Sequence, residues 1–446
     1  MIRMRLGTAL VFSILGLGLM GCEEALDEPT PVQADSGTPD VADDQSVKPD
    51  VVQPEASPDV APDVTPDVLP DNVIADVVPE AEPEAEAEAS VPQPSGEVQI
   101  LTINDFHGQL DPLSSKEGVI TSYYGGIGYL STYFKEERAA NPNTVIINGG
   151  DEIGASPTLS AYGTDLADEP AVRSLNFLGL TASNLGNHNF DHGTAHLKAL
   201  MDIADYAYVG ANVNDPNGEL GDQLIKPFHM VEFGTAEPKI KVAIIGLSNP
   251  ETPDIVLAGQ MGTVTISEPL AAANAAAEAA RNAGAHIVIG SAHVGAIGFD
   301  ATDQTLPVGP LADLAKQVKG FDLIQGGHTE AEFKKQFGNT WVVQGPARGH
   351  AYYRVKFTLT DGKVTGTTLE EVTVLGQQTQ PVPNPEPDGG ALNCTTGTCP
   401  TDFTCVAGST PSKDLCVKDV KTSDPDVVPL MAPWKAGLKA KFANDY

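Results

Sequence analysis

The feature that most limits what this chain can fold into is an alternation of apolar, strand-like runs with helix-like stretches. The strand-like runs cover residues 98–103, 144–148, 239–247, 285–291 and 321–325, and the helix-like stretches cover 128–138, 170–178, 194–203, 269–282 and 311–318. Such alternation is typical of α/β domains. Later runs at 340–344, 352–359 and 363–374 predict an antiparallel finish. We therefore expect one α/β domain over residues 97–375.

The N-terminus has the pattern of a cleaved export signal over residues 1–22. Two arginines precede the apolar run 6–20, which is short for a membrane span of about 20 residues. Cys22 follows Leu19-Met20-Gly21, and this pattern resembles a bacterial lipoprotein processing site. We expect Cys22 to carry lipid and Glu23, in place of Asp, to favour the outer membrane. The alternatives are an ordinary signal peptide with an unrelated cysteine, or a short membrane anchor.

Residues 23–96 differ sharply in composition from the rest of the chain. They contain 20 acidic residues and one lysine, in a chain with a net charge of −34, and Pro-Asp-Val recurs in them. This composition offers too little apolar surface to offset the entropy of ordering, so we expect a disordered, extended tether. The acidic balance also argues against duplex nucleic acid as a partner, because such binding needs a basic face.

A second change of composition comes after residue 375, where a Pro/Gly-rich and then Cys-rich segment covers 376–420. An even cysteine cluster in an exported protein predicts two disulfides with three possible pairings, among Cys394, Cys399, Cys405 and Cys416. The alternative is a zinc site, which would normally show closely spaced Cys-x-x-Cys pairs.

The C-terminal segment 421–446 places apolar residues at helical spacing. Pro429 and Pro433 interrupt its first half, and proline removes a backbone donor inside a helix. We therefore expect a helix confined to the later part of this segment.

Metal-ligating residue types follow four of the strand-like runs, 98–103, 144–148, 285–291 and 321–325, and a further short apolar run at 180–184, at the point where each run ends. They occur in Asn104-Asp105-Phe106-His107, Gly149-Gly150-Asp151, Gly186-Asn187-His188-Asn189-Phe190-Asp191, Ser291-Ala292-His293 and Gly326-Gly327-His328-Thr329-Glu330. Taken singly, such motifs are commonly turns or core histidines. Together they lie at the strand ends where α/β sheets bind ligands. Imidazole and carboxylate without thiolate suit Zn, Mn or Fe. Two bridged ions would activate a hydroxide and clamp an in-line phosphoryl displacement.

Over residues 97–374 this series resembles the 5′-nucleotidase branch of the calcineurin-like metallophosphatases. The resemblance implies a four-layer α/β/β/α sandwich and two divalent metal ions, such as Zn or Mn. It implies a first metal held by Asp105, His107, Asp151 and Glu330, and a second held by Asp151, Asn187, His293 and His328. His188 and Asp191 match the catalytic dyad. His188 would steady the phosphoryl charge and help the leaving oxygen, oriented by Asp191.

Two residues depart from the family pattern. Glu330 stands where the family usually has His or Gln, and it adds negative charge to a competent oxygen ligand. Asn189 stands where the family commonly has Glu, at a position that we do not expect to bind metal. The family's C-terminal substrate domain is expected to be absent, with 421–446 resembling the interdomain helix. We therefore expect loose selectivity among phosphate esters.

These features predict a monomeric, exported, lipid-anchored metallophosphoesterase that hydrolyses nucleotides or other small phosphoesters. Two alternatives stay open. One is a non-catalytic surface protein that binds ligands and derives from the same family, which Glu330 and the expected lack of a substrate domain favour. The other is a related hydrolase of sulfur esters. His192 is a further candidate for a contact behind the dyad.

Overall fold

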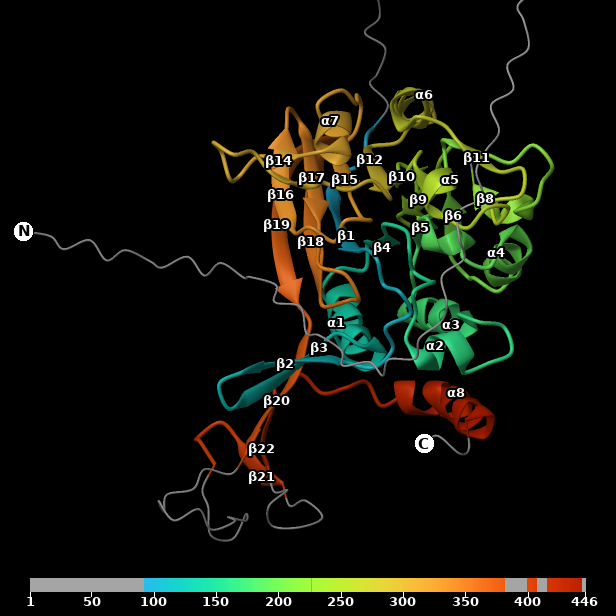
Figure 1. Cartoon of the computed structure of the whole chain (residues 1–446). Coiled ribbons are helices and arrows are strands. Elements are labelled where there is room, and N and C mark those ends of the chain that lie inside the picture. Colours follow the sequence, from blue (N-terminus) through green and yellow to red (C-terminus); the bar gives the residue numbers. More distant parts are fainter. Residues whose placement is uncertain (1–91, 226, 382–398, 407–414, 443–446) are drawn as a thin grey trace, which may run out of the picture. The chain divides into compact units, whose positions relative to one another are not determined.

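The computed structural model of the chain describes residues 92–225, 227–381, 399–406 and 415–442 (Figure 1). By internal contacts the chain divides into Met1–Ala85 and Glu86–Tyr446, and the second unit contains every described residue. The predicted signal peptide with Cys22, most of the predicted linker and Cys394 lie outside the described residues. No helix in the described part of the chain is both long and apolar enough to span a membrane.

Two β-sheets pack face to face at the centre of the fold. The first contains β1 (Gly96–Ile103), β4 (Thr144–Asn148), β5 (Ala182–Asn184), β6 (Ala207–Val209), β8 (Leu224–Ile225), β18 (Ala351–Thr360) and β19 (Lys363–Thr373), in the order β19-β18-β1-β4-β5-β6-β8. The second contains β9 (His229–Phe233), β10 (Ile240–Leu247), β12 (Ile287–Ala292), β15 (Leu323–Gln325), β16 (Phe333–Phe337) and β17 (Thr340–Gln344), in the order β16-β17-β15-β12-β10-β9. Apolar side chains of both sheets form one shared cluster, including Ile100, Ile147, Ile244 and Ile289.

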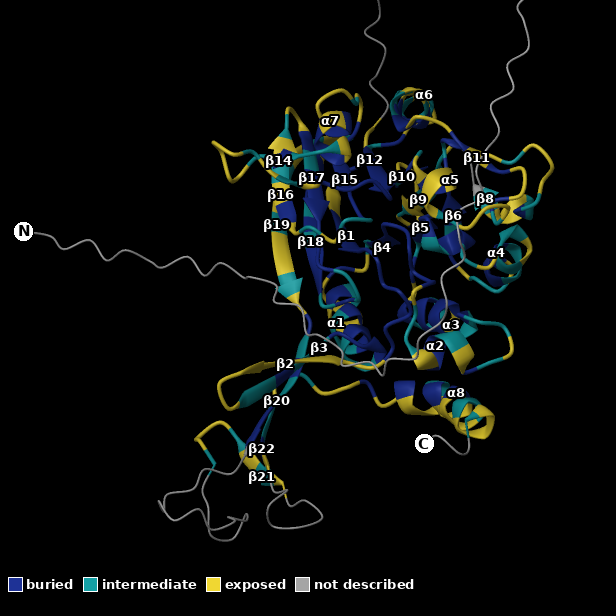
Figure 2. Cartoon of the chain, viewed as in Figure 1, coloured by how far each residue is buried: buried dark blue, intermediate teal, exposed yellow. Residues whose placement is uncertain are grey.

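Helices cover the outer face of each sheet, so the layers follow the expected α/β/β/α order (Figure 2). The first sheet is covered by α1 (Ile127–Ala140), α3 (Glu169–Leu178) and α4 (Thr194–Met201). The second is covered by α6 (Pro269–Asn282) and α7 (Pro310–Ala315). In α6, alanines at helical spacing form the buried stripe. Alanine has the highest helix propensity of all residues, and its small side chain lets the helix pack closely on the sheet. The predicted fold class is confirmed.

Several short elements connect these layers. They are α2 (Thr158–Tyr162), α5 (Thr252–Ile255), the 3-10 turns η1 (His188–Phe190) and η2 (Gly221–Gln223), and the paired strands β7 (Val213–Asn214) with β11 (Thr265–Ile266) and β13 (Gly298–Phe299) with β14 (Pro307–Val308).

Parallel pairing brings the carboxyl ends of the central strands to a common edge. In the first sheet β1, β4 and β5 run parallel, and in the second β10, β12 and β15 do. Hydrogen bonds join the two edges: the Ser291 hydroxyl donates to the Asn148 carbonyl at 2.8 Å, and the Gln325 amide donates to the Ile103 carbonyl. The loops after these strands therefore share one end of the sandwich.

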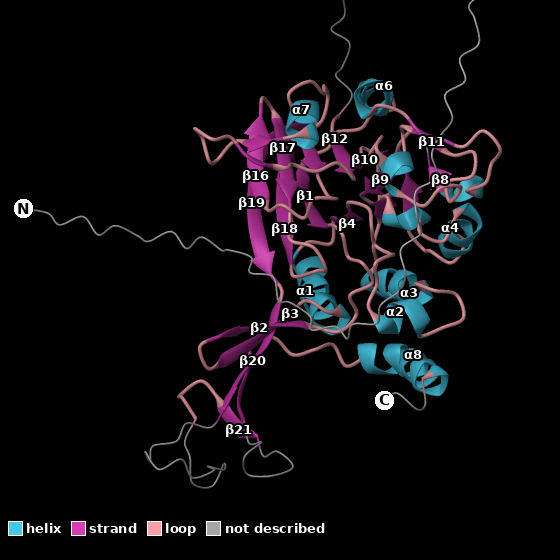
Figure 3. Cartoon of the chain, viewed as in Figure 1, coloured by secondary structure: helices cyan, strands magenta, loops and turns pink. Residues whose placement is uncertain are grey.

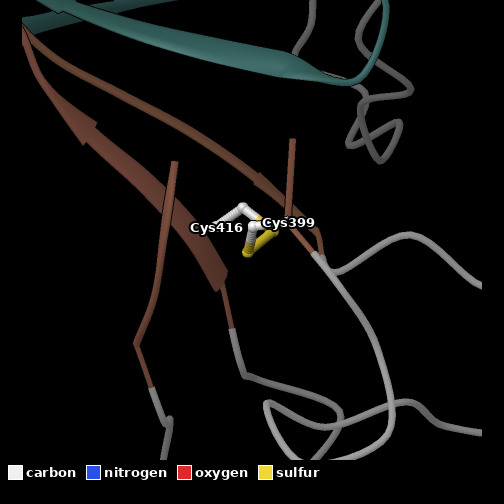
Figure 4. The surroundings of a disulfide bond; sticks show 2 residues. All are labelled: Cys399 and Cys416. Atoms are coloured by element: carbon white, nitrogen blue, oxygen red, sulfur yellow. A yellow bond between two sulfur atoms is a disulfide. The ribbon is translucent and has the colours of Figure 1, made fainter. Parts of the chain in front are cut away.

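A third, five-stranded sheet was not anticipated from the sequence (Figure 3). It contains β2 (Leu113–Glu117), β3 (Ile120–Tyr124), β20 (Leu375–Pro381), β21 (Thr404–Val406) and β22 (Leu415–Asp419). A disulfide between Cys399 and Cys416 lies at its end, with the two Cα atoms 5.4 Å apart (Figure 4). Cys405 is also in a disulfide. The prediction of disulfides in place of zinc is thus confirmed for these three cysteines, and it is typical of an oxidising, extracytoplasmic compartment.

The prediction for the C-terminal helix was wrong about where the helix begins. The observed α8 spans Val427–Lys441 and includes both prolines. Pro429 lies in the first turn, where a missing backbone N–H costs nothing because that N–H has no partner within the helix. Burial of Met431 and Trp434 in the core over α2 and α3 stabilises the turn that contains Pro433. Packing here outweighs the local preference of proline.

Candidate metal centre

Left-handed backbone geometry marks the loops that follow the central strands. Five of the predicted ligands have positive φ angles although none is glycine: Asp105 (47°), His107 (47°), Asp151 (52°), His328 (72°) and Glu330 (53°). Each such residue costs about 1–3 kcal/mol and persists only where the surrounding structure holds it. Backbone strain concentrated on five residues of one edge is a pattern found at functional sites.

Two sets of ligand atoms form at this edge. Asp105, His107 and Asp151 place one ligand atom each within 4.8 Å of one another, and so do Asp151, His293 and His328. Asp151 belongs to both sets. A carboxylate has two oxygens, so a shared Asp151 fits the bridging position between two cations that the resemblance implies.

Hydrogen bonds fix which ring nitrogen of two histidines carries the proton. Nδ1 of His107 lies 2.9 Å from the Gly154 carbonyl, and Nδ1 of His293 lies 2.9 Å from the Gly149 carbonyl. A carbonyl oxygen can only accept, so Nδ1 donates in both rings and a neutral ring keeps its lone pair on Nε2. Metal-binding histidines typically donate their other N–H to a carbonyl in this way.

In the second set, two ring nitrogens lie within hydrogen-bond distance of side-chain oxygens. Nε2 of His293 lies 3.1 Å from Oδ1 of Asn187 and 3.1 Å from a carboxylate oxygen of Asp151. Nδ1 of His328 lies 2.9 Å from the same Asn187 oxygen. The structure thus brings together Asn187, His293, His328 and Asp151, and these residues fit a divalent ion.

Burial and charge together set the protonation of this cluster. Burial alone would lower the pKa of His293, but the adjacent Asp151 carboxylate outweighs it and raises the pKa to about 9. Burial likewise opposes ionisation of Asp151, yet the facing histidines hold its pKa below the usual value. Burial raises the pKa of Asp105. A metal ion entering the second set would therefore have to displace a proton from His293.

A glycine allows the loop after β4 to approach His293 closely. Gly150 has φ of 92°, and a Cβ atom built there would lie 2.6 Å from Nδ1 of His293. Only glycine lets the backbone pass at this distance, which explains why this motif carries glycine next to the shared Asp151.

The predicted dyad is assembled beside the shared carboxylate. Nδ1 of His188 lies 2.8 Å from a carboxylate oxygen of Asp191, and the His188 backbone N–H donates to Asp151 at 2.9 Å. The hydrogen bond with Asp191 raises the pKa of His188, although partial burial opposes it. The ring of His188 lies edge-on to that of His107, with centroids 5.2 Å apart. These contacts favour an imidazolium next to the first set.

Glu330 lies beside the first set and outside its close group of ligand atoms. Its nearest carboxylate oxygen is 3.8 Å from Nε2 of His107, and its side chain is 48% exposed. His192 is exposed, and its ring packs on His196 with centroids 4.9 Å apart. The structure thus places Glu330 next to His107 but outside the close group of ligand atoms, and His192 contacts His196 outside the dyad.

A buried network beneath the shared carboxylate was not predicted from the sequence. The side-chain oxygen of Asn189 accepts from the Gly186 N–H at 2.7 Å and the Asp151 N–H at 3.3 Å, while its amide donates to Glu152 at 2.7 Å. Ser183 also donates to Glu152 at 2.8 Å. Burial raises the pKa of Glu152. The departure from the family at position 189 was the available signal.

A four-layer sandwich with two ligand sets joined by one carboxylate at its strand ends defines the metallophosphoesterase class of fold.

No family model matches the chain. The chain is 25% identical over 277 residues to endonuclease YhcR of Bacillus subtilis, covering 59% of this chain and 22% of that protein. It is 29% identical over 246 residues to a snake venom 5′-nucleotidase of Gloydius brevicauda, covering 54% of this chain and 38% of that protein.

A solved structure shows the same fold. The 5′-nucleotidase precursor from Thermus thermophilus superposes with a TM-score of 0.52 at 21% identity, covering 63% of this chain and 55% of that one. In sequence and fold, the chain is similar to members of the 5′-nucleotidase and calcineurin-like metallophosphoesterase family. The chain spans well under half the length of the bacterial endonuclease and of the venom enzyme.

Proposed function

We propose that this protein is an exported, lipid-anchored, metal-dependent phosphohydrolase that acts on nucleotides or similar small phosphoesters. The observation that carries the proposal is the pair of ligand sets that share Asp151. The relatives support the substrate class, since they include a 5′-nucleotidase and an endonuclease, whose substrates are phosphoesters.

The ligand residues and the His188–Asp191 dyad have separate roles in a phosphoryl transfer. When bound, two divalent ions polarise the phosphoryl oxygens and lower the pKa of a water nucleophile. Asp105, His107 and Asp151, with Glu330, would hold the first ion. Asp151, Asn187, His293 and His328 would hold the second. Asp191 accepts a hydrogen bond from Nδ1–H of His188 and so fixes the ring. Nε2 of the charged ring then donates to the phosphoryl or leaving-group oxygen.

The assignment is tested by hydrolysis assays on the purified full chain with Mn²⁺ or Zn²⁺. AMP, cyclic nucleotides and an aryl phosphate serve as substrates. His188→Ala should lower kcat by about 100-fold or more, because general acid catalysis contributes on that scale. His192→Ala is the matched control and should keep full activity. Hydrolysis that is absent with every metal, or equal in His188→Ala, would refute the proposal.

Glu330 supports a second candidate, a surface protein that binds ligands without turnover. Its carboxylate is half-exposed and lies outside the close group of ligand atoms. Replacing Glu330 with His tests this candidate. If Glu330 is a variant ligand, the substitution keeps or raises activity. A protein that binds phosphate esters with no hydrolysis in either form would favour the second candidate.

We also propose that Cys22 carries the lipid and that residues 23–96 tether the catalytic domain to the outer membrane. The signal pattern and the acidic, proline-rich composition support this proposal. Cys22→Ser should release the protein from the membrane fraction. Equal membrane retention of the wild-type protein and the variant would contradict lipid anchoring.

A further inference from the structure

A pocket of about 320 Å³ lies directly beside Glu330. Its walls include Tyr124 at the end of β3, Arg348 and His350 from the loop between β17 and β18, and Glu330 with Glu332. We call it the Arg348 pocket. Its volume is at the lower end of the range for sites that bind small molecules, so it suits one compact group.

Arg348 has a side chain that is available to a ligand. It is half-buried, and its guanidinium makes no hydrogen bond or ion pair with the described residues. Each other arginine in the described part of the chain is engaged: Arg138 with the Leu178 carbonyl, Arg173 with Glu169, Arg281 with Asp322, and Arg354 with Glu137 and Glu370. An unpaired arginine beside a pocket in so acidic a chain is therefore distinctive.

The loop that carries Arg348 is fixed to the first ligand set. The Arg348 backbone N–H donates to the carbonyl of Asp105 at 2.8 Å, and Arg348 itself has a strained φ of 59°. Asn104 and Gly345 exchange two hydrogen bonds of 3.0 Å, one in each direction. The pocket is thus held in a set position relative to the proposed reaction centre, as a binding site for part of the substrate requires.

The chemistry of the walls selects between possible ligands. The rings of Tyr124 and His350 meet edge-on with centroids 4.4 Å apart, which adds an aromatic surface to the guanidinium. A second phosphate group would face the carboxylates of Glu330 and Glu332 at this site. A planar heterocycle has both acceptors for arginine and donors for glutamate, and it stacks on guanidinium and aromatic faces.

We propose that the Arg348 pocket binds the leaving group of the substrate, a nucleobase or similar planar heterocycle, through hydrogen bonds and stacking from Arg348. This inference rests on the proposed phosphohydrolase function and assigns the substrate class of the same site. The catalytic domain would then supply its own base contact.

The test compares a nucleoside 5′-monophosphate, whose leaving group carries a heterocyclic ring, with glycerol phosphate, whose leaving group has none. In the full chain with Mn²⁺, Arg348→Ala should lower the ratio of kcat/KM for the nucleotide over glycerol phosphate by about tenfold or more, as expected for a lost charge-assisted hydrogen bond. Arg348→Lys should restore little of the ratio, since lysine cannot stack. Arg173→Ala, an exposed arginine on α3, is the control and should leave the ratio unchanged.

An unchanged ratio in Arg348→Ala would overturn the inference, and so would an equal loss on both substrates, which would assign Arg348 to the phosphate. If the wild-type protein hydrolyses neither substrate, the proposed function fails, and nucleoside binding then tests the pocket by itself. Calorimetric titration with adenosine and inosine should show binding of at least one nucleoside that weakens about tenfold or more in Arg348→Ala. No binding of either nucleoside would overturn the inference.

Discussion

Asn189 holds the backbone on both sides of the shared carboxylate. Its side chain joins the N–H groups of Asp151 and Gly186 to the buried carboxyl of Glu152. Asn189→Ala would remove this acceptor from the Asp151 and Gly186 N–H groups and one donor from Glu152, at about 1–3 kcal/mol for each group left unsatisfied. We expect unfolding in urea at lower concentration and weaker metal binding than in the control Asn214→Ala, which alters an exposed asparagine. Equal stability and metal content in both variants would contradict this role.

For individual residues, the sequence predicted which side chains are candidate ligands better than it predicted the hydrogen bonds that hold them in place. Asp105, Asp151 and His293 follow buried strands, and parallel pairing alone brings strand ends together. The network through Asn189 and Glu152 depends on which way each side chain turns, and a sequence does not show that. The position of Glu330, close to His107 and partly exposed, also depends on the left-handed turn that precedes the β16 strand.

At the scale of elements, α8 illustrates how packing decides structure. Trp434 is 7% exposed in the core that α8 shares with α2 and α3, whereas Val428 on the same helix is 69% exposed. Trp434→Ala should lower the free energy of unfolding by about 3–5 kcal/mol. Val428→Ala should change it by less than about 0.5 kcal/mol. Urea denaturation measures both, and similar losses in the two variants would show that α8 does not pack as described.

The pairing of β10 with β12 carries a pH dependence. The Lys241 backbone N–H donates to Nδ1 of His286 at 3.0 Å, so the ring must be neutral there. Partial burial, with the charges of Lys241 and Arg281, lowers the pKa of His286. Its contribution to stability is therefore present above the unfolded pKa of about 6.5 and lost as pH falls through the lower folded pKa.

His286→Asn keeps an acceptor but cannot titrate, which makes it a direct test of this dependence. The drop in unfolding free energy between pH 7.5 and pH 5.5 should be smaller in the variant than in the wild-type protein. If the two proteins lose the same stability over this interval, His286 does not titrate as its contacts indicate.

Elements were predictable from sequence where burial is complete. The strands β4 and β17 and the helix α6 have the predicted bounds. Continuous apolar runs predicted the two strands, and alanines at helical spacing predicted the helix. The hairpin of β2 and β3 was missed, since all five residues of β2 are exposed and β3 pairs with β20, a segment far away in the chain. The beginning of α8 was misjudged because proline preference was weighed without the core contacts.

At the scale of the whole molecule, the site couples metal binding to stability. The ligand sets draw on loops from both central sheets, so an ion would join the two halves of the sandwich. An ion that binds only the folded chain at 100 times its Kd should stabilise it by about 2.7 kcal/mol. Thermal unfolding with and without chelator, followed by Mn²⁺ or Zn²⁺ addition, measures this effect. An unchanged melting temperature would show that no such site forms.

The central claim is that one carboxylate serves two metal ions, and a metal count tests it most directly. Elemental analysis of the purified wild-type chain should give about two divalent ions per chain. Asp151→Asn removes the bridging charge and should lose both ions, whereas Asp313→Asn, an exposed aspartate on α7, should keep them. A wild-type content of one ion or none, or an Asp151→Asn variant that retains the wild-type content, would contradict the shared-carboxylate site.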